Sequence, residues 1–203
     1  NLRRLELLSS GFTGAGLEHL AGLEKLEAIE FCNCPALKGE AMHHLVGLPS
    51  LTSVVHLYSY GLGDQGISAL SAARGLKTLK LQSSLVSDVS LDRLTKFSNL
   101  RSLALEQSCV TDQGLARLSS FPNLVELSLM ECGTYTDAGL VQLQPLQKLQ
   151  WIHLGSNQLT DACVEPLSQL SALKKLIVTR NPGISADGQA QLKLALPECE
   201  IEF

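Results

Sequence analysis

The chain has 203 residues, of which 45% are hydrophobic and 18% charged, so it can form a packed core and is not intrinsically disordered. Its 16 Lys and Arg residues stand against 20 Asp and Glu residues, and the resulting net charge of −4, with scattered basic residues, disfavours nucleic acid as a partner. No apolar run reaches the roughly 18 residues that a membrane-spanning helix needs.

The opening residues, Asn1 and Leu2, already belong to a repeating leucine pattern and show no charged-then-apolar signal pattern. We therefore expect one domain over residues 1–203 that is a fragment truncated at its N-terminus. The first repeat of such a fragment has no N-terminal cap, so its apolar flank around Leu2, Leu5 and Leu7 should be exposed.

An L-x-x-L-x-L frame recurs along the whole chain at steps of 24 or 25 residues. The first residues of its copies are Leu2, Leu26, Leu51, Leu76, Leu100, Leu124, Leu149 and Leu173. A ninth, degenerate copy, Glu198-x-x-Ile201-x-Phe203, closes the chain. Alternating leucines predict a short strand in each copy.

The third copy is irregular, because Leu51-x-x-Val54-x-His56 would bury His56 and expose Leu57. A one-residue bulge that turns Val55 and Leu57 inward is the preferred interpretation. The alternative is a regular strand with a buried histidine.

Two residues separate the end of each frame from a small polar residue. The column consists of Ser10, Cys34, Ser59, Ser84, Ser108, Cys132, Asn157 and Asn181. Where the chain leaves a strand, such a side chain can bond to backbone groups of the neighbouring turn that would otherwise lack partners.

A second motif predicts a short helix in each unit. It is clearest in Thr111-Asp112-Gln113-Gly114-Leu115 and Thr136-Asp137-Ala138-Gly139-Leu140, and it recurs in shorter form at Gly63-Asp64, Ser87-Asp88 and Thr160-Asp161. A hydroxyl at the N-cap and an acid in the first turn favour a helix start. The row of aspartates also suggests calcium, but the loops offer no D-x-D-x-D cluster, so we interpret the row as helix capping.

These units resemble the leucine-rich-repeat superfamily. The T-D-x-G-L-x-x-L helix with Cys or Asn after the strand is similar to the cysteine-containing, ribonuclease-inhibitor-like subclass, and residues 196–201 are similar to the ends of many bacterial leucine-rich-repeat proteins. The resemblance implies an α/β solenoid in the form of a horseshoe arc. It would contain a parallel sheet, short helices, eight repeats of 24–25 residues and a C-terminal strand.

Strands lie about 4.8 Å apart while packed helices need roughly 8–10 Å, so the stack must curve with its strands on the concave face. The residues between the inward leucines then form three columns on that face. The first is Arg4, Ala28, Ser53, Thr78, Ser102, Glu126, Trp151 and Lys175; the second is Glu6, Glu30, an unassigned third-copy residue, Lys80, Ala104, Ser128, His153 and Ile177. The third includes Leu8, Cys32, Gln82, Glu106, Met130, Gly155 and Thr179.

These columns contain most of the candidate partner-binding residues. Exposed aromatic and methionine side chains beside charges are typical of interface hot spots. The candidates are Trp151, Met130 and His153, rimmed by Glu106, Glu126 and Glu131, together with Lys80, Gln82, Tyr58 and Tyr60. The alternative for Trp151 is a surface aromatic packed on Lys175 and Glu126 with no partner.

The sequence predicts a binding protein and not an enzyme. Its five histidines fall in different repeats or helices, without a paired nucleophile, and we expect no cofactor. The six cysteines lack a C-x-x-C pair or a second ligand pair for Cys32 and Cys34, so we expect mostly buried thiols and no metal.

We predict a protein-protein interaction module that binds a protein partner on its concave face. Two alternatives are an inhibitor or regulator of an enzyme, and a targeting domain of a larger enzyme whose catalytic part is not in this chain. The acids Glu198, Glu200 and Glu202 keep the last strand from pairing further, so we expect a monomer.

Overall fold

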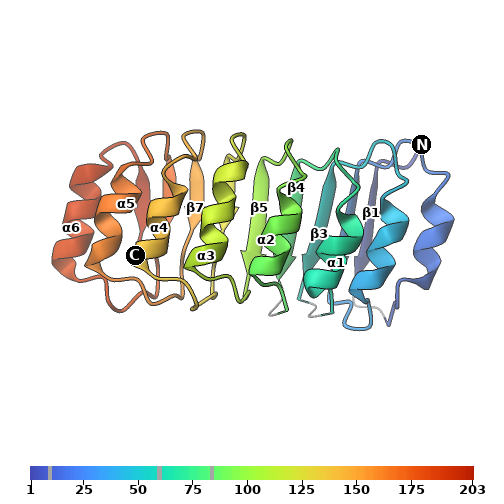
Figure 1. The fold of residues 1–203 in the computed structure, drawn as a ribbon, viewed down its shortest axis with the longest axis horizontal. Helices are drawn as coiled ribbons and strands as arrows, with labels where there is room; N and C mark the ends of the chain where they lie inside the picture. Colours follow the sequence, from blue (N-terminus) through green and yellow to red (C-terminus); the bar gives the residue numbers. More distant parts are fainter. Residues whose placement is uncertain (9–10, 59–60, 83–84) are drawn as a thin grey trace.

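Each unit of the chain begins with a short strand, and successive strands pair in parallel in the computed structural model (Figure 1). The structure describes residues 1–8, 11–58, 61–82 and 85–203. Within these ranges the strands are β1 (Arg4–Leu8), β2 (Ala28–Cys32), β3 (Ser53–Leu57), β4 (Thr78–Gln82), β5 (Ser102–Glu106), β6 (Glu126–Ser128), β7 (Trp151–His153), β8 (Lys175–Ile177) and β9 (Glu200–Glu202). They form one sheet in sequence order, as predicted.

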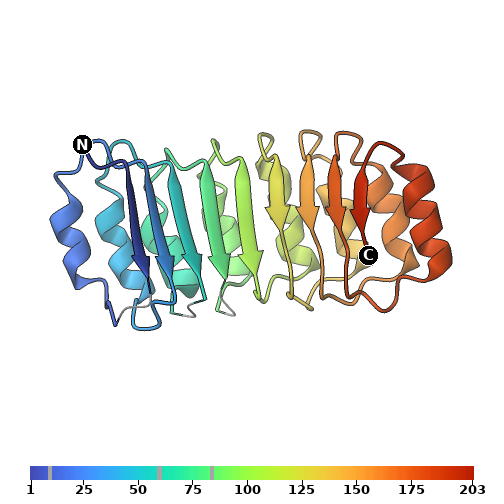
Figure 2. The same cartoon turned by 180° about the vertical axis from the view of Figure 1, so that it is seen from behind.

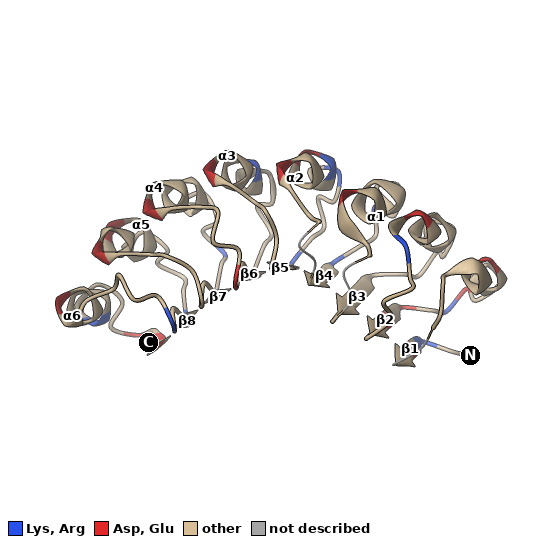
Figure 3. Cartoon of the chain, turned by 90° about the horizontal axis from the view of Figure 1, so that it is seen from below, with Lys and Arg blue, Asp and Glu red and all other residues tan. Residues whose placement is uncertain are grey.

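A short helix follows each strand but the last and lies behind the sheet (Figure 2). The α-helices are α1 (Gly63–Leu70), α2 (Asp88–Leu94), α3 (Asp112–Leu115), α4 (Asp137–Leu140), α5 (Val164–Ser168) and α6 (Ala186–Ala195). The 3₁₀ helices are η1 (Ala15–Leu20), η2 (Gly39–Leu45), η3 (Ala116–Ser120), η4 (Val141–Leu143) and η5 (Asp161–Cys163). Seen along the strands, the helices form the outer, convex side of an arc and the strands the inner, concave side (Figure 3).

The core lies between the sheet and the helices and consists of leucine rows that cross all units. Leu103, Leu127 and Ile152 are neighbours in register on β5, β6 and β7, and none of them is more than 1% exposed. A fully buried side chain of this size contributes roughly 1.5–3 kcal/mol. Because the frame recurs in every unit, stacking supplies the burial that one unit lacks.

The bulge predicted for the third copy is wrong. Strand β3 pairs with β2 and β4 without interruption, with His56 opposite both Phe31 and Leu81. His56 is fully buried, while Val55 and Leu57 face the concave side and are half-buried. A bulge would disrupt the hydrogen-bond ladders on both sides of this central strand, and a regular strand keeps them at the expense of one buried imidazole.

The polar column after the strands bonds to the backbone of the preceding unit, as predicted, at four of its five described positions, and the Ser108 hydroxyl instead pairs with the Cys132 thiol. The Asn157 amide nitrogen donates to the Leu129 carbonyl of the preceding unit at 3.0 Å, and its oxygen accepts from the backbone N–H of Cys132 at 3.0 Å. Asn181 and Cys132 make similar bonds to the backbone of preceding units. Ser10, Ser59, Ser84 and Tyr60 lie outside the described residues.

The two ends of the arc differ in how their apolar residues are covered. Leu2 is 43% exposed and Leu5 and Leu7 are half-buried, which confirms the expected exposed flank in part. At the other end, Ile201 and Phe203 of the last strand region pack against the core. The ammonium group of Lys193 lies 5.3 Å from the centre of the Phe203 ring.

The prediction of mostly buried cysteines is confirmed for half of them. Cys34, Cys132 and Cys163 are buried, Cys32 and Cys199 are half-buried, and Cys109 is exposed. Among the described residues, no helix is long and apolar enough to span a membrane.

Candidate recognition surface

The sheet register confirms the first two predicted columns of the concave face. Trp151 pairs with Glu126 on one side and Lys175 on the other, and His153 pairs with Ser128 and Ile177. The unassigned residue of the second column is Val55, which lies opposite Lys80. The register therefore fixes the neighbours of each candidate residue across the strands.

Trp151 and His153 form an aromatic pair on β7. Their rings meet edge to face, with centroids 5.9 Å apart and planes at 74°, and both side chains are half-buried. Burial lowers the pKa of His153, an effect that the carboxylates of Glu106 and Glu202 oppose. The imidazole is therefore neutral at pH 7, and the pair presents an uncharged surface with ring edges available to a partner.

Met130 extends this apolar group from the neighbouring unit, where it is half-buried just after β6. Glu106 is held beside it, since its carboxylate accepts a hydrogen bond from the Ser128 hydroxyl at 2.8 Å. The predicted residues of this group therefore come from three adjacent strands.

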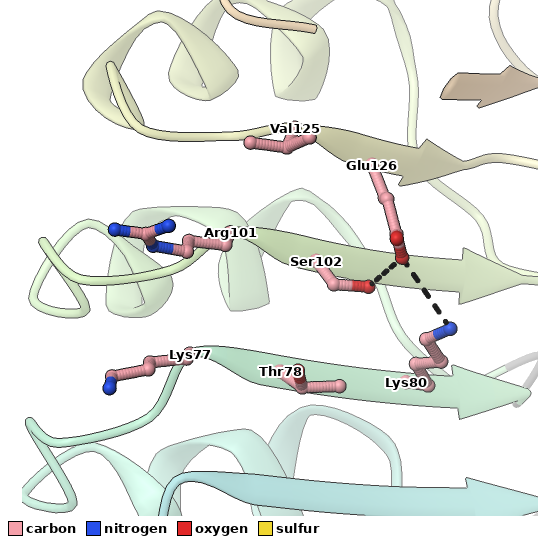
Figure 4. A pocket seen from close by; sticks show the side chains of 7 residues that line it. All are labelled: Lys77, Thr78, Lys80, Arg101, Ser102, Val125 and Glu126. Atoms are coloured by element: carbon pink, nitrogen blue, oxygen red, sulfur yellow. Dashed lines mark hydrogen bonds and ion pairs between the residues drawn. The ribbon is translucent and has the colours of Figure 1, made fainter. Parts of the chain in front are cut away.

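Glu126 on β6 contacts side chains on two other strands of the face, β5 and β4 (Figure 4). Its carboxylate accepts a hydrogen bond from the Ser102 hydroxyl at 2.7 Å and lies 3.7 Å from the Lys80 ammonium group. The side chains of Lys80 and Glu126 are 41% and 48% exposed, so this ion pair adds little to stability. It does set the orientation of both charges.

A shallow hollow of about 310 Å³ surrounds this pair (Figure 4). It is lined by Lys77, Thr78, Lys80, Arg101, Ser102, Val125 and Glu126. Sequence reasoning missed Lys77 and Arg101, because they lie one position before the columns that were considered. Among the described residues neither has a carboxylate within 4.0 Å, and both point toward the start of the strands, away from Glu126.

No protein-family model and no curated protein sequence matches the chain. Solved structures do match. Internalin C2 from Listeria monocytogenes is 24% identical, with a TM-score of 0.62, over 94% of this chain and 76% of that one. Internalin F from the same organism is 18% identical, with a TM-score of 0.60, over 92% of this chain and 56% of that one. The chain has the leucine-rich-repeat fold.

Another solved structure matches this chain over a small part of a longer protein. The TLR13 chain in its complex with ssRNA13 is 21% identical, with a TM-score of 0.60, and this chain covers 26% of its length. The likeness to these proteins concerns the fold, which commonly serves as a binding module and not as a catalytic one.

Two of the predicted partner-binding residues, Tyr58 and Gln82, lie beside each other at the C-terminal ends of β3 and β4. Tyr58 is 62% exposed, with a left-handed backbone conformation at φ 54°. Its N–H donates to the amide oxygen of Gln82 at 2.8 Å, and Gln82 is only 8% exposed. Gln82 thus holds the turn of the preceding repeat and leaves Tyr58 as the accessible member of the two.

The aspartate row on the convex side does more than cap helices. In the motif Thr111-Asp112-Gln113-Gly114 we call the first, second and fourth places the hydroxyl, aspartate and glycine positions. Each hydroxyl caps its own helix, as Thr111 does by accepting from the N–H of Gln113. Its N–H and hydroxyl also donate to the aspartate of the preceding repeat, here Asp88, at 2.8 and 2.6 Å.

This pairing recurs at five successive repeat interfaces. The pairs are Asp64 with Ser87, Asp88 with Thr111, Asp112 with Thr136, Asp137 with Thr160, and Asp161 with Ser185. Figure 3 shows acidic residues along the row of helices. Capping, which we expected, is thus accompanied by bonds between repeats, and these bonds occupy the oxygens that a calcium ion would need.

Glycine occupies the glycine position at three of the five interfaces, whereas in the fourth repeat Ser90 stands there and its hydroxyl donates to Asp64. A Cβ atom on Gly114, Gly139 or Gly188 would overlap the carboxylate of the aspartate in the preceding repeat. In the seventh repeat Cys163 takes this position, and burial, with Asp137 and Asp161 nearby, raises its pKa to about 12. The T-D-x-G motif could have indicated this contact, but the hydroxyl residue of one motif binds the aspartate of another motif 23 or 24 residues earlier.

Proposed function

We propose that this leucine-rich-repeat chain is a protein-protein interaction module that binds a protein partner on its concave face. The observation that carries the proposal is the Trp151 and His153 pair, an uncharged aromatic group within a rim of fixed charges. Hot spots in protein interfaces combine such a desolvated aromatic centre with polar surroundings.

The charges of the face favour a protein over a nucleic acid. Glu106, Glu126 and Glu131 surround the aromatic group, and they would repel a phosphate backbone. Arg4, Lys80 and Lys175 already contact carboxylates on other strands. Only the edge with Lys77 and Arg101 offers unpaired positive charge among the described residues of the hollow.

The experiment compares wild-type protein with Trp151→Ala in affinity capture, followed by affinity measurement with the partner that only wild type retains. We expect the substitution to weaken the complex by about 2 kcal/mol or more, roughly 30-fold, since truncation removes an aromatic anchor. The unfolding temperature should change little, because Trp151 is half-buried on the sheet surface.

Leu194→Ala on α6 is the matched control, since Leu194 is 81% exposed on the convex side. It should leave affinity unchanged. Equal affinity of wild type and Trp151→Ala would discard the aromatic group as the binding site, and retention of RNA or DNA in place of a protein would overturn the partner class.

We also propose membership of the cysteine-containing, ribonuclease-inhibitor-like subclass and a monomeric state. The subclass is supported by Cys34 and Cys132, whose thiols donate to carbonyls of the preceding repeat at 3.4 and 3.3 Å. The monomer is supported by the acids on β9, where Glu200 and Glu202 both bind Lys175.

A further inference from the structure

The hydroxyl position and the aspartate position of neighbouring repeats vary together along the chain. The five aspartates from Asp64 to Asp161 are each followed, in the next repeat, by Ser or Thr. Where the aspartate is missing, the hydroxyl is missing as well: Gly14 is followed by Lys38, and Gly39 is followed by Gly63. A hydroxyl residue at this position therefore marks a repeat that receives a carboxylate.

The first repeat has the receiving residues but receives nothing in the structure. Its motif is Thr13-Gly14-Ala15-Gly16, with threonine at the hydroxyl position and glycine at the glycine position. Thr13 is exposed and makes no hydrogen bond with its side chain to any described residue. A Cβ atom on Gly16 would meet only the Phe12 ring at 3.6 Å, whereas one on Gly139 would overlap a carboxylate.

The same end of the arc exposes the apolar residues that interior repeats bury. Leu5 and Leu7 are half-buried, while their register partners Ile29 and Phe31 are 0% exposed. Strand β1 is the first of the sheet, so one of its edges has no neighbouring strand among the described residues. Apolar cover, strand pairing and a carboxylate are thus absent together at one face.

We propose that this face, formed by Leu2, Leu5, Leu7, Thr13 and Gly16, is an interface for a further leucine-rich-repeat unit with an aspartate at its helix start. The carboxylate accepts hydrogen bonds from the N–H and hydroxyl of Thr13 and lies over Gly16. The geometry continues the five interfaces inside the chain. It does not depend on the function proposed for the concave face.

A second copy of this chain does not fit the face in the same way. Head-to-tail stacking would place β9 beside β1, and no helix follows β9 among the described residues. The last helix start of the chain, in the eighth repeat, has Ala186 at the aspartate position. Alanine offers no acceptor for the Thr13 hydroxyl. The occupant is therefore a unit of the type found in the middle of the chain.

The test uses a chain in which residues 99–122 are copied directly before Asn1. The junction then repeats the natural Pro122-Asn123-Leu124 sequence as Pro-Asn1-Leu2, and it places the copied Asp112 23 residues before Thr13, the separation between Asp88 and Thr111. We expect the extended chain to unfold at a temperature several degrees higher and its β1 amides to exchange more slowly.

Thr13→Val and replacement of the copied Asp112 by Ala test the bond itself in a double-mutant cycle. Each should lower the unfolding midpoint of the extended chain, and the double variant should be no worse than the poorer single variant. In the chain without the added unit, Thr13→Val should have no effect. An added unit that stays unfolded, additive effects of the two substitutions, or an equal effect of Thr13→Val in both chains would overturn the proposal.

Discussion

At the scale of single residues, the imidazole of His56 is the least satisfied group of the core. Neither ring nitrogen has a hydrogen-bond partner among the described residues, and the ring of Phe31 lies 6.2 Å away. Burial lowers the pKa of His56 from 6.5 to about 4. Folding therefore favours the neutral imidazole, and protonation favours the unfolded chain.

This pKa gives a sign and a pH window. The contribution of the neutral His56 to the free energy of unfolding is fully present above pH 6.5 and is lost as the pH falls toward 4. The unfolded chain then binds a proton that the folded chain does not. The loss by pH 4 is on the order of 3 kcal/mol. We expect His56→Leu to be stabilising at pH 4 and to flatten this part of the pH dependence.

Urea unfolding of wild type and variant at pH 7.5 and pH 4 measures the difference. His19→Gln serves as the control, since the side chain of His19 is 82% exposed, and it should keep the wild-type dependence. If His56→Leu loses as much stability between the two pH values as wild type does, burial of His56 is not the cause.

At the scale of elements, the start of each helix is shaped by the repeat before it. Gly139 lies inside α4, where alanine has the higher helix propensity by about 1 kcal/mol. A methyl group there would overlap the Asp112 carboxylate and press on the Leu115 side chain. For Gly139→Ala, the contact with the preceding repeat is therefore expected to lower stability, whereas helix propensity is expected to raise it.

We expect the steric overlap to outweigh the gain in helix propensity, so that Gly139→Ala lowers the free energy of unfolding by about 2 kcal/mol. Chemical denaturation measures this change. Gly16→Ala is the matched control at the same position of the first repeat, where space is open, and it should be neutral or slightly stabilising. Stabilisation by Gly139→Ala would show that the aspartate can move aside without loss.

Much of the arrangement of strands and helices could be predicted from the sequence. Leucine spacing placed the strands and their inward faces, because burial requires the alternation that the sequence displays. It failed at His56, since the rule that polar side chains avoid the core was given more weight than continuity of the ladder. The bonds between Asp and the next hydroxyl were missed because each helix start was considered alone.

The candidate site was less predictable than the fold. Column membership follows from register, so the neighbours of Trp151 were placed correctly. How each side chain is used depends on the local turn: Gln82 is occupied by the N–H of Tyr58, and Lys77 joins the hollow from a position outside the columns. Neither fact has a counterpart in the repeat pattern.

At the scale of the whole molecule, each strand of the arc in Figure 3 pairs only with the strands of adjacent repeats, within the part of the chain that the structure describes. Stability of such an array is the sum of unit and interface contributions, and an end unit has one interface instead of two. The first repeat is further weakened because Leu5 and Leu7 remain half-buried and the helix start lacks a bonded aspartate.

Local opening should therefore begin at this end. Native-state hydrogen exchange is expected to show faster exchange for β1 and η1 amides than for those of β5 to β7 and α3. Uniform protection along the chain would contradict this gradient and would indicate that the whole array unfolds as one cooperative block.

The residues with left-handed backbone conformation after the strands affect how the surface of the protein can change during evolution. Asn33, Tyr58, Gln107, Glu131, Ser156 and Arg180 all have φ between 53° and 56°. The backbone shape is the same in each, while the side chains differ in size, polarity and charge. One rim of the arc can therefore acquire new surface chemistry by point substitution, with the leucine rungs and the asparagine turns left as they are.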